Sequence, residues 1–449
     1  MTRSISAVAD GMPNESADHA LVRQTAAIAS VDDFVVDKVG GERLPSSVMG
    51  RYSKHGYTLG WCVQVDFSDG SRRELHVLGD GSFPYTAPRV AVVGGPDILV
   101  WPHLEWGGLL CILPTDAAVS VNNPTGVVEF VLGEACKLIE DNITGANADD
   151  FRKEFLSYWL MAVDRDVPRF ISLIEPCGPS RRVLVWHGKG ARVIADDRRA
   201  LSQWLSRWGA RAGKGKDYTF HDGVLVWLPE PLLPSEYPGT AADIRVLAKC
   251  RAPDAAAVLE DLAASRVDEI DLLLGAPTEN GACFGAVTVR PPRVSGGPKR
   301  KGDPLVAGFR PGHVPKNLLV SRYLSEAASV TKATVERADH LWIHGRDHDS
   351  RQERLRRVRV AVLGCGSLGA PLVRLLAQSG VGNFLLVDCG RMDWPNVGRH
   401  ELSATSVGRS KALELAREIE QGYPHLGDIS ARQHRVGVNR RAIRTPFPG

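Results

Sequence analysis

The chain has 449 residues, 43% of them hydrophobic, which predicts about two to four domains with cores of their own. The formal charge of +3 is small for this length, so the composition gives no case for a nucleic-acid partner. The eight cysteines form no CxxC pair, which favours a reducing cytoplasm over a disulfide framework or a structural zinc site, and we assign no metal ligands.

Residues 1–20 contain no apolar stretch of signal-peptide length. No apolar run elsewhere approaches the ~20 residues that a membrane helix needs. We therefore expect a disordered N-terminus, no membrane partner and a cytoplasmic protein.

Residues 21–163 combine strand-like and helical patterns. Alternating runs at 57–71, 72–80 and 89–95 predict strands, and the apolar spacing of 126–145 predicts a closing helix. This order indicates an α+β domain.

A proline-rich loop after these strands leads to a histidine and then to a cysteine in the run "GGLLCIL". This order resembles the ubiquitin-conjugating family, which has a YPxxPP-like turn, a His-Pro-Asn element and a catalytic cysteine. The residues that carry the resemblance are Phe83, Pro84, Pro88, His103 and the stretch 108–112. Leu104 follows His103, so the amide that stabilises an oxyanion in the family is absent here.

The resemblance implies that Cys111 accepts the C-terminus of a carrier protein as a thioester, since a thiolate is the nucleophile in such transfers. The apolar neighbours of Cys111 leave open that it is a buried core cysteine. We interpret His103 as fixing the loop rather than as a base, and Cys136 as a core residue at helical spacing.

Residues 164–289 predict an α/β spacer domain without a motif to which chemistry can be assigned. The patterns indicate strands at 181–188 and 222–229 and helices at 196–211 and 254–265. Residues 290–318 are rich in Pro, Gly and Lys, a composition typical of a linker.

The last block, residues 319–449, begins with a predicted helix near Leu319 and contains a nucleotide-binding pattern. A strand is followed by Gly364, Gly366 and Gly369, spaced GxGxxG, then by a helix and a second strand that ends in Asp388. Such glycines let the backbone approach a phosphate at a helix N-terminus, and the acid can take ribose hydroxyls. The spacing alone leaves dehydrogenases, methyltransferases and purely structural turns open.

The residues after Asp388 narrow these alternatives. Asn396, Arg399 and Lys411 follow in the order of the ThiF-type, ubiquitin-activating adenylation family, which the segment from 358 to 424 resembles. The family usually has a second acid where this chain has Gly390, so one ribose or metal contact differs.

The resemblance implies ATP and Mg²⁺ as cofactors, because the family activates a carboxylate as an acyl adenylate. Arg399 and Lys411 are the candidates to stabilise charge that develops on the phosphates. Both could instead be solvated surface cations, and Asn396 could simply cap a turn. We interpret Cys365 and Cys389 as packing residues.

Together the blocks resemble bacterial fusions of a conjugating-like domain with a ThiF-type domain, as in the cyclic-oligonucleotide (CBASS) antiphage operons. The resemblance implies transfer of the C-terminal tail of a CD-NTase partner to a target amine. A non-catalytic binding protein and an NAD-dependent oxidoreductase remain as alternatives.

From 358 onward we expect three strands and two helices, which is one half of a doubly wound, Rossmann-like sheet. In the family the other half carries the magnesium-binding aspartate and the activating cysteine. We expect this chain to be truncated or completed by another chain, and its last region to be loosely packed unless a homodimer covers it.

Overall fold

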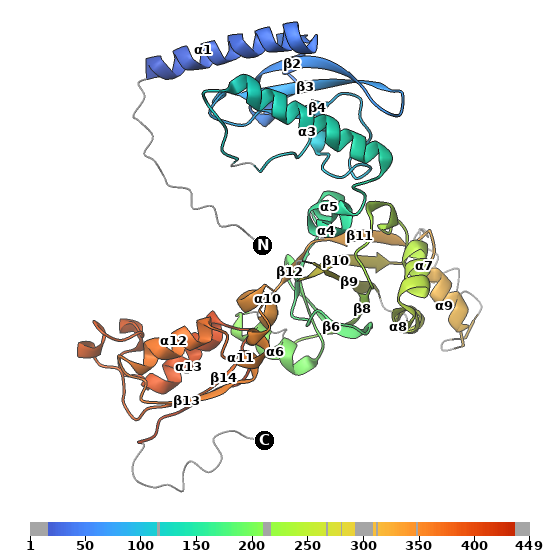
Figure 1. The fold of residues 1–449 in the computed structure, drawn as a ribbon. Helices are drawn as coiled ribbons and strands as arrows, with labels where there is room; N and C mark the ends of the chain where they lie inside the picture. Colours follow the sequence, from blue (N-terminus) through green and yellow to red (C-terminus); the bar gives the residue numbers. More distant parts are fainter. Residues whose placement is uncertain are drawn as a thin grey trace, which may run out of the picture. The chain divides into compact units, whose positions relative to one another are not determined.

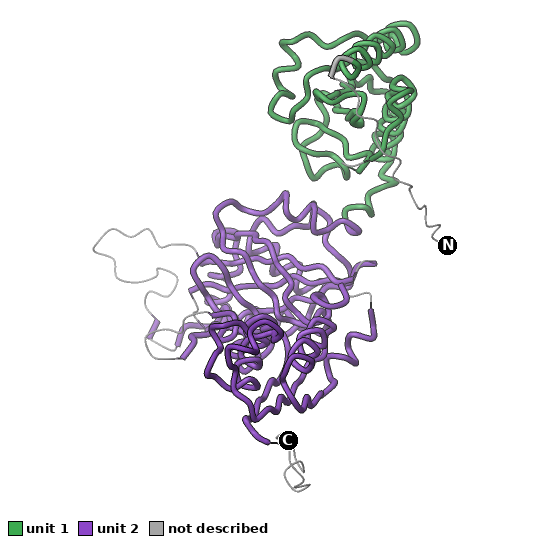
Figure 2. The backbone as a smooth tube through the Cα atoms, turned by 90° about the vertical axis from the view of Figure 1, so that its left-hand side faces the viewer, with its two compact units in different colours: residues 1–151 green, residues 152–449 purple. Residues whose placement is uncertain are grey.

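The computed structural model describes residues 17–114, 117–209, 217–265, 268–279, 281–291, 309–310, 313–346 and 349–435. Figure 1 labels their helices and strands, and Figure 2 shows the two compact units into which the chain divides, residues 1–151 and 152–449. None of the helices in the described ranges is both long and apolar enough to cross a bilayer.

The expected disordered N-terminus, residues 1–20, falls mostly outside the described residues, which begin at 17. Residues 17–20 form the start of helix α1 (Ala17–Phe34), which differs from the expectation. The physical reason is that Ala27 and Val31 anchor this helix in the core, so its first turn extends from an ordered segment. Most of the expected linker, residues 292–308 and 311–312, also lies outside the described residues.

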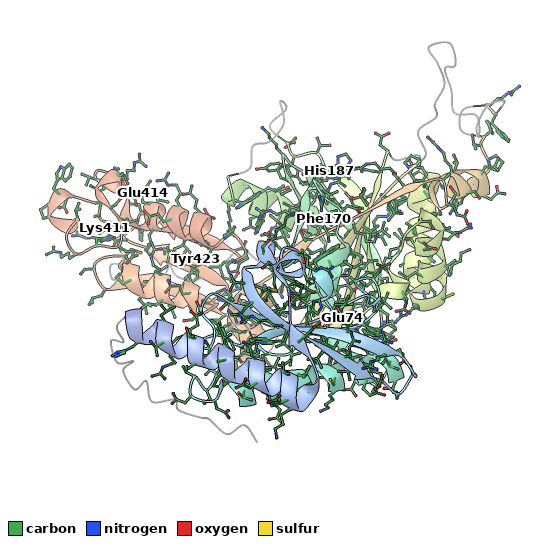
Figure 3. All side chains as sticks on the ribbon, turned by 90° about the horizontal axis from the view of Figure 1, so that it is seen from above. Glu74, Phe170, His187, Lys411, Glu414 and Tyr423 are labelled. Atoms are coloured by element: carbon green, nitrogen blue, oxygen red, sulfur yellow. The ribbon has the colours of Figure 1, made fainter. Side chains whose placement is uncertain are left out.

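Unit 1 is a four-stranded antiparallel sheet in the order β1-β2-β3-β4, with α1 and α3 packed on one face. Because side chains alternate along a strand, Trp61 and Val77 enter this main core, whereas Cys62 and Leu78 face a smaller one under α2. Glu74 of β3, labelled in Figure 3, lies on this second face with His76. The elements are α1, η1 (Val35–Val39), β1 (Glu42–Arg43), α2 (Ser46–Met49), η2 (Ser53–His55), β2 (Tyr57–Asp66), β3 (Arg72–Asp80), β4 (Arg89–Val92), η3 (Trp106–Gly108), α3 (Pro124–Thr144) and α4 (Asp150–Lys153).

The first part of unit 2 is an eight-stranded mixed sheet in the order β11-β10-β9-β8-β6-β7-β5-β12. The strand patterns expected at 181–188 and 222–229 correspond to β6 and β8, which pair antiparallel. The elements are α5 (Phe155–Ala162), β5 (Arg169–Ser172), β6 (Arg181–His187), β7 (Ala191–Ala195), α6 (Arg198–Arg207), β8 (His221–Trp227), η4 (Pro234–Glu236), α7 (Ala241–Arg251), α8 (Pro253–Ala264), β9 (Ile270–Thr278), β10 (Gly281–Arg290), α9 (Lys316–Tyr323), β11 (Ser329–Ala333) and β12 (Val335–Arg337).

The two outermost strands of this sheet are consecutive in the sequence. Only Thr334 separates β11, which pairs with β10, from β12, which pairs with β5 at the opposite end of the order. One continuous segment, residues 329–337, therefore bridges both edges of the sheet. The sheet thus extends beyond the expected end of the spacer domain at residue 289, because strands from the expected third domain complete it.

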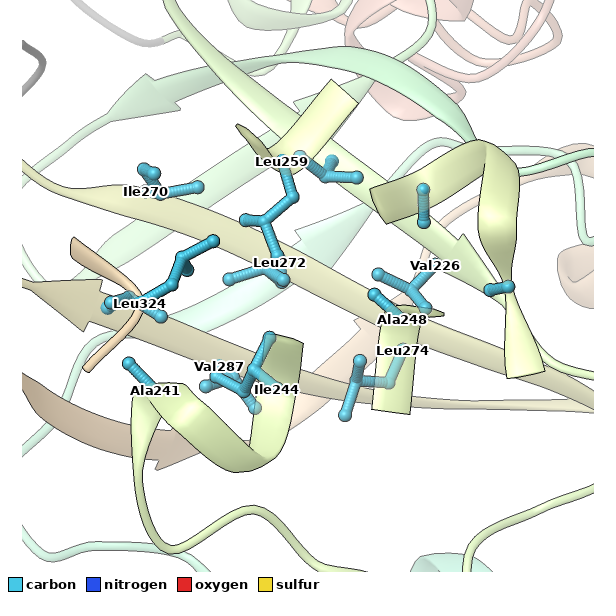
Figure 4. Packing of buried hydrophobic residues seen from close by; sticks show 14 of the residues in the cluster. Val226, Ala241, Ile244, Ala248, Leu259, Ile270, Leu272, Leu274, Val287 and Leu324 are labelled. Carbon is cyan, nitrogen blue, oxygen red and sulfur yellow. The ribbon is translucent and has the colours of Figure 1, made fainter. Parts of the chain in front are cut away.

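The main core of this sheet lies under α7, α8 and α9. Figure 4 shows Ile244 of α7 and Leu259 of α8 packed against Leu272, Leu274 and neighbouring sheet residues. All four side chains are at most 2% exposed, so each contributes roughly 1.5–3 kcal/mol of hydrophobic free energy. Burial of this size gives the sheet a core of its own within unit 2.

The last part of unit 2 is a parallel sheet in the order β13-β14-β15 with the expected strand–helix–strand–helix–strand sequence. Its core includes Val373 of α12, Phe384 of β14 and Leu415 of α13. The basic end of the chain, residues 436–449, lies outside the described residues. The elements are α10 (His340–Gly345), α11 (Arg351–Arg357), β13 (Arg359–Leu363), α12 (Gly369–Gln378), β14 (Asn383–Val387), η5 (Trp394–Asn396), η6 (Ala404–Ser406), α13 (Lys411–Gly422) and β15 (Ile429–Arg432).

Candidate functional site

The glycine turn between β13 and α12 has three glycines with three different environments. Gly364 has φ +97°, a conformation that L side chains rarely adopt. A Cβ atom at Gly369 would lie 1.9 Å from the carbonyl oxygen of Gly364, so only glycine lets α12 pack on the turn. A Cβ atom at Gly366 would meet no protein atom within 4 Å, which leaves open space on the side that a ligand can approach.

Asp388, at the end of β14, ties the second strand to this turn. One carboxylate oxygen accepts a hydrogen bond from the Cys365 amide at 2.7 Å, and the other accepts from the Gly390 amide at 2.6 Å. Two backbone donors hold the carboxylate in one orientation, and each oxygen keeps a lone pair for a further donor.

The start of α13 is held against the residues that follow Asp388. Arg391 and Ser410 form an isolated antiparallel bridge, and the Lys411 amide donates to the Gly390 carbonyl at 3.1 Å. A Cβ atom at Gly390 would lie 3.0 Å from the Asp388 carboxylate and 3.6 Å from Cδ of Lys411. The structure therefore brings Asp388, Gly390 and Lys411 together, and Figure 3 shows Lys411 at the beginning of its helix.

Asn396 and Arg399 lie in the loop between β14 and α13. Asn396 ends a short 3-10 turn, and its Oδ1 atom is buried without a hydrogen-bond partner. An unpaired buried amide oxygen costs free energy, so a donor from a ligand would be favourable here. The Arg399 side chain is exposed to solvent.

His400 is a residue of this site that the sequence analysis did not identify. Its Nε2 donates to the Cys365 carbonyl at 2.7 Å, and its Nδ1 accepts from the Leu402 amide at 3.0 Å. These two bonds fix a neutral tautomer and attach the loop of Asn396 and Arg399 to the glycine turn. His400 belongs to no sequence motif, so its role in attaching this loop to the glycine turn could not be predicted from the sequence.

The two cysteines beside the turn differ in environment. Cys365 is fully buried, and burial, with a smaller contribution from Asp388, raises the pKa of its thiol to about 11. This agrees with a packing residue. Cys389, for which we also predict a packing role, is instead exposed, because it lies two residues beyond the end of β14 at Val387 and outside the sheet.

In unit 1 the Cys111 side chain is exposed, in contrast to the alternative of a buried core cysteine. Its backbone is held by a ladder, since the Leu110 amide donates to the Val90 carbonyl and the Cys111 amide donates to the His103 carbonyl, both at 2.8 Å. Leu109 and Leu110 fill the core beside it. Apolar neighbours thus anchor the strand-like segment and leave the thiol at its end.

His103 holds the loop before Cys111. It has φ +60°, unusual for a residue other than glycine, and its Nε2 lies 3.3 Å from Oδ2 of Asp150. The carbonyl contact to Cys111 and the side-chain contact to Asp150 support the interpretation that His103 fixes the loop.

Close backbone packing shapes the other side of this loop. Gly108 has φ +79°, and a Cβ atom there would lie 2.3 Å from the Val92 carbonyl oxygen. Arg89 donates to the Leu110 carbonyl at 2.9 Å and pairs with Glu105 at 3.1 Å. The segment that presents Cys111 is therefore attached to β4 on both sides.

Comparison with known proteins identifies two families. Residues 42–168 match the prokaryotic E2 family B, and residues 342–445 match the ThiF family. A sulfur carrier protein adenylyltransferase of Thermus thermophilus is 39% identical over 15% of this chain and 26% of its own length. The ATP-dependent ubiquitin transferase-like protein Cap2 of Pseudomonas aeruginosa is 23% identical over 76% of this chain and 60% of its own length.

The Cap2 protein of Escherichia coli is 41% identical over 14% of this chain and 11% of its own length. Among solved structures, Escherichia coli MccB with ATP is 28% identical over 19% of this chain and 25% of MccB, with a TM-score of 0.19. Escherichia coli TcdA with AMP is 23% identical over 21% of this chain and 38% of TcdA, with a TM-score of 0.20. The chain spans less than two thirds of the length of these relatives.

The two matched regions define the class of protein, that of the ubiquitin-activating and ubiquitin-conjugating-like enzymes. The chain contains one region that matches the prokaryotic E2 family B and one that matches the ThiF family. The resemblance stated from the sequence motifs is confirmed in this respect.

Proposed function

We propose that this protein activates the C-terminus of a carrier protein with ATP and transfers it, through thioesters, to an amine of a target protein. The observation that carries the proposal is the presence in one chain of an exposed thiol in an E2-type domain and of a glycine turn with Asp388 and Lys411 in a ThiF-type domain. Neither feature alone separates transfer from simple binding.

The glycine turn suits the phosphates of ATP. The space beside Gly366 lets backbone amides approach the anion, and the N-terminus of α12 adds its positive dipole end. The Lys411 ammonium and the Arg399 guanidinium are the cations that would stabilise charge on the phosphates as pyrophosphate leaves. Asp388 would accept ribose hydroxyls with its remaining lone pairs.

Magnesium normally accompanies ATP, but the described residues around the turn do not form a magnesium site by themselves. Asp388 is the carboxylate held at the turn, and both of its oxygens already accept backbone hydrogen bonds. Mg²⁺ requires several oxygen ligands in octahedral geometry, and a single carboxylate does not supply them.

Cys111 would act as the acceptor in the transfer. Its thiolate attacks the activated acyl carbon and displaces the leaving group, and a target amine then attacks the thioester and restores the thiol. His103 would position this segment through its carbonyl and its contact with Asp150. The exposure of Cys111 supports access by both a carrier tail and a target.

The name of the relative Cap2, a ubiquitin transferase-like protein, supports a protein as the substrate. We propose a CD-NTase C-terminal tail as the carrier, in a cytoplasmic CBASS antiphage system. Adenylation in the ThiF domain precedes transfer in the E2 domain.

The full chain, incubated with ATP, Mg²⁺ and a CD-NTase, tests the whole sequence of steps. We expect an adduct that dithiothreitol releases, that needs ATP and the last residue of the carrier, and that Cys111→Ala abolishes. Cys177→Ala, at an exposed cysteine of unit 2, is the matched control and keeps the adduct.

A carrier peptide with a C-terminal thioester tests Cys111 separately from activation, since it needs no ATP. If the Cys111→Ala variant forms the adduct equally well, the proposal that the protein is an enzyme with Cys111 as its acceptor thiol is wrong. ATP-independent binding of the carrier without any adduct would favour a binding protein, and turnover of NADH would favour an oxidoreductase.

A further inference from the structure

We propose that unit 1 contains a binding site for a zinc-type divalent cation, formed by Cys62, Glu74 and His76. The three residues offer one sulfur, one oxygen and one nitrogen atom that all lie within 4.8 Å of one another. This set of donors is typical of sites for Zn²⁺ and similar first-row ions. The site is separate from Cys111 and from the glycine turn proposed to bind ATP, and it does not depend on the proposed transfer activity.

The strand register brings the donors together. Cys62 of β2 lies directly opposite His76 of β3, and Gln64 lies opposite Glu74. On this face of the sheet, Cys62, Glu74 and His76 are direct or diagonal neighbours. Glu42 of β1 is the opposite neighbour of Cys62 and adds a further carboxylate at the edge of the cluster.

Two neighbouring side chains orient the donors. The Tyr52 hydroxyl lies 2.9 Å from Nδ1 of His76, so the ring presents Nε2 to the cluster. Gln64 donates to one oxygen of Glu74 at 3.0 Å, and the other oxygen lies 2.7 Å from Nε2 of His76. Outer partners of this kind fix ring and carboxylate orientation in metal sites.

Access and burial also fit a small ion. His76 is 1% exposed, whereas the Glu74 side chain is 39% exposed, so the cluster opens to solvent on the carboxylate side. On the inner side, the buried Tyr52 and Leu78 of β3 belong to the small apolar core on this face of the sheet. Three protein ligands leave a fourth position for water or a substrate.

The charges around the thiol favour a cation. The carboxylates of Glu74 and Glu42 act on Cys62, and the positive charge of Arg51 acts on His76. When the ion binds, the thiol proton of Cys62 leaves to solvent and the imidazole proton is carried on Nδ1 instead of Nε2, where the Nδ1–H group donates a hydrogen bond to the Tyr52 oxygen.

A second group of three potential metal ligands, in unit 2, shows the contrast. His187, Glu269 and Asp271 also lie within 4.8 Å of one another, but Arg192 pairs with both carboxylates. Arg290 contacts Glu269 as well, at 2.8 Å. Guanidinium groups already neutralise these acids, so we infer no cation site there.

Titration of the full chain with Co²⁺ tests the site, because cobalt bound to a thiolate has a sulfur-to-metal charge-transfer band in the near ultraviolet. We expect one such site in unit 1, and competition by Zn²⁺. Cys62→Ser should abolish the band, and His76→Gln should weaken binding at least about 100-fold.

Three variants serve as controls. Cys136→Ser removes a thiol on the other face of the same sheet, Cys111→Ser removes an exposed thiol, and His187→Gln alters the second cluster; all three should keep the band. Glu74→Gln, at a partly exposed position, should weaken binding about 10-fold or more, with circular dichroism checking the fold. A band that persists in Cys62→Ser, or no sulfur band in the unmodified chain, would overturn the proposal.

Discussion

Gly366 and Gly369 illustrate how two glycines of one motif serve different purposes. A methyl group at Gly369 would collide with the Gly364 carbonyl oxygen, whereas one at Gly366 would extend into open space. The fold therefore requires a glycine at position 369. At position 366 a glycine is needed only to leave space for a ligand that approaches the turn.

Alanine substitutions should separate these two needs. We expect Gly369→Ala to destabilise unit 2 by roughly 1–3 kcal/mol, because the helix must move away from the turn. Gly366→Ala should leave the melting temperature unchanged and weaken ATP binding, measured by calorimetry. Equal losses of stability in the two variants would contradict this assignment.

Cys111 and Cys365 should differ in their reactivity toward alkylating reagents. At pH 7.5 we expect iodoacetamide to label Cys111, which is exposed, and to spare Cys365. Cys365 is both shielded and protonated, since its pKa is raised to about 11, and its thiolate forms only as pH rises toward that value. Mass spectrometry of labelled peptides, before and after unfolding in urea, checks this; early labelling of Cys365 would argue against a packed turn.

Elements of unit 2 are joined by a buried arginine of α6. Arg207, 8% exposed, donates to the Leu426 carbonyl at 2.6 Å and the Gly427 carbonyl at 2.9 Å, and pairs with Glu420. These bonds connect the spacer sheet to the loop before β15.

Arg207→Ala should weaken this connection by roughly 3 kcal/mol, because charged hydrogen bonds to buried carbonyls are lost. Amide exchange in β15 should then become about 100-fold faster. Arg199→Ala is the control, since Arg199 pairs with Asp428 in an exposed ion pair and should have little effect. Unchanged exchange in Arg207→Ala would show that other contacts hold the strand.

A group of three imidazoles joins α10 to the same loop. Nε2 of His344 lies 2.8 Å from Nε2 of His425, and Nε2 of His340 lies 2.8 Å from the Gly380 carbonyl. Burial, followed by the neighbouring positive charges, lowers the pKa of His340 to about 4 and of His425 to about 3.

These shifts predict that unit 2 loses stability in acid. Between pH 6.5 and about 4 the unfolded chain binds protons that the folded imidazoles do not, so the free energy of unfolding falls as pH falls through this window. We expect a lower melting temperature at pH 5 than at pH 7.5. In His425→Asn the difference should be smaller, and an unchanged slope would count against this cause.

For helices and strands, the sequence predicted where single elements lie better than it predicted which elements pair with one another. Alternation and helical spacing predicted β2, β3, β6, β8 and α3, since these patterns depend on neighbours in the chain. The pairing of β11 and β12 with β10 and β5, and the register that brings Cys62 to His76, depend on residues distant in sequence, so no local pattern indicates them. The same holds for His400, because its Nε2 donates to the backbone carbonyl of Cys365 in the glycine turn, 35 residues away in the sequence.

The whole molecule presents an apolar surface at α12. Leu368, Leu372 and Leu375 are between 48% and 86% exposed, and Leu363 of the neighbouring strand is 56% exposed. At helical spacing these side chains form one stripe on the surface.

We expect a second copy of the chain to cover this stripe, which makes protease resistance of residues 358–449 depend on concentration. Dilute protein should be cut there, and concentrated protein should be protected and sediment as a dimer. Leu372→Glu should remain sensitive at all concentrations, with Leu156→Glu, at an exposed leucine elsewhere in unit 2, as the control. A protected monomer would contradict the expectation.

The segment 329–337 also bears on biosynthesis. Because the segment 329–337 supplies both outermost strands and pairs with β10 and β5, the spacer sheet cannot be completed on the ribosome until residue 337 has emerged from the exit tunnel. Until then β10 and β5 each keep one unpaired edge, exposed to chaperones and to neighbouring nascent chains. A pause in translation just after this segment has emerged would shorten the time for which these edges are unpaired, whereas a pause just before it would lengthen that time.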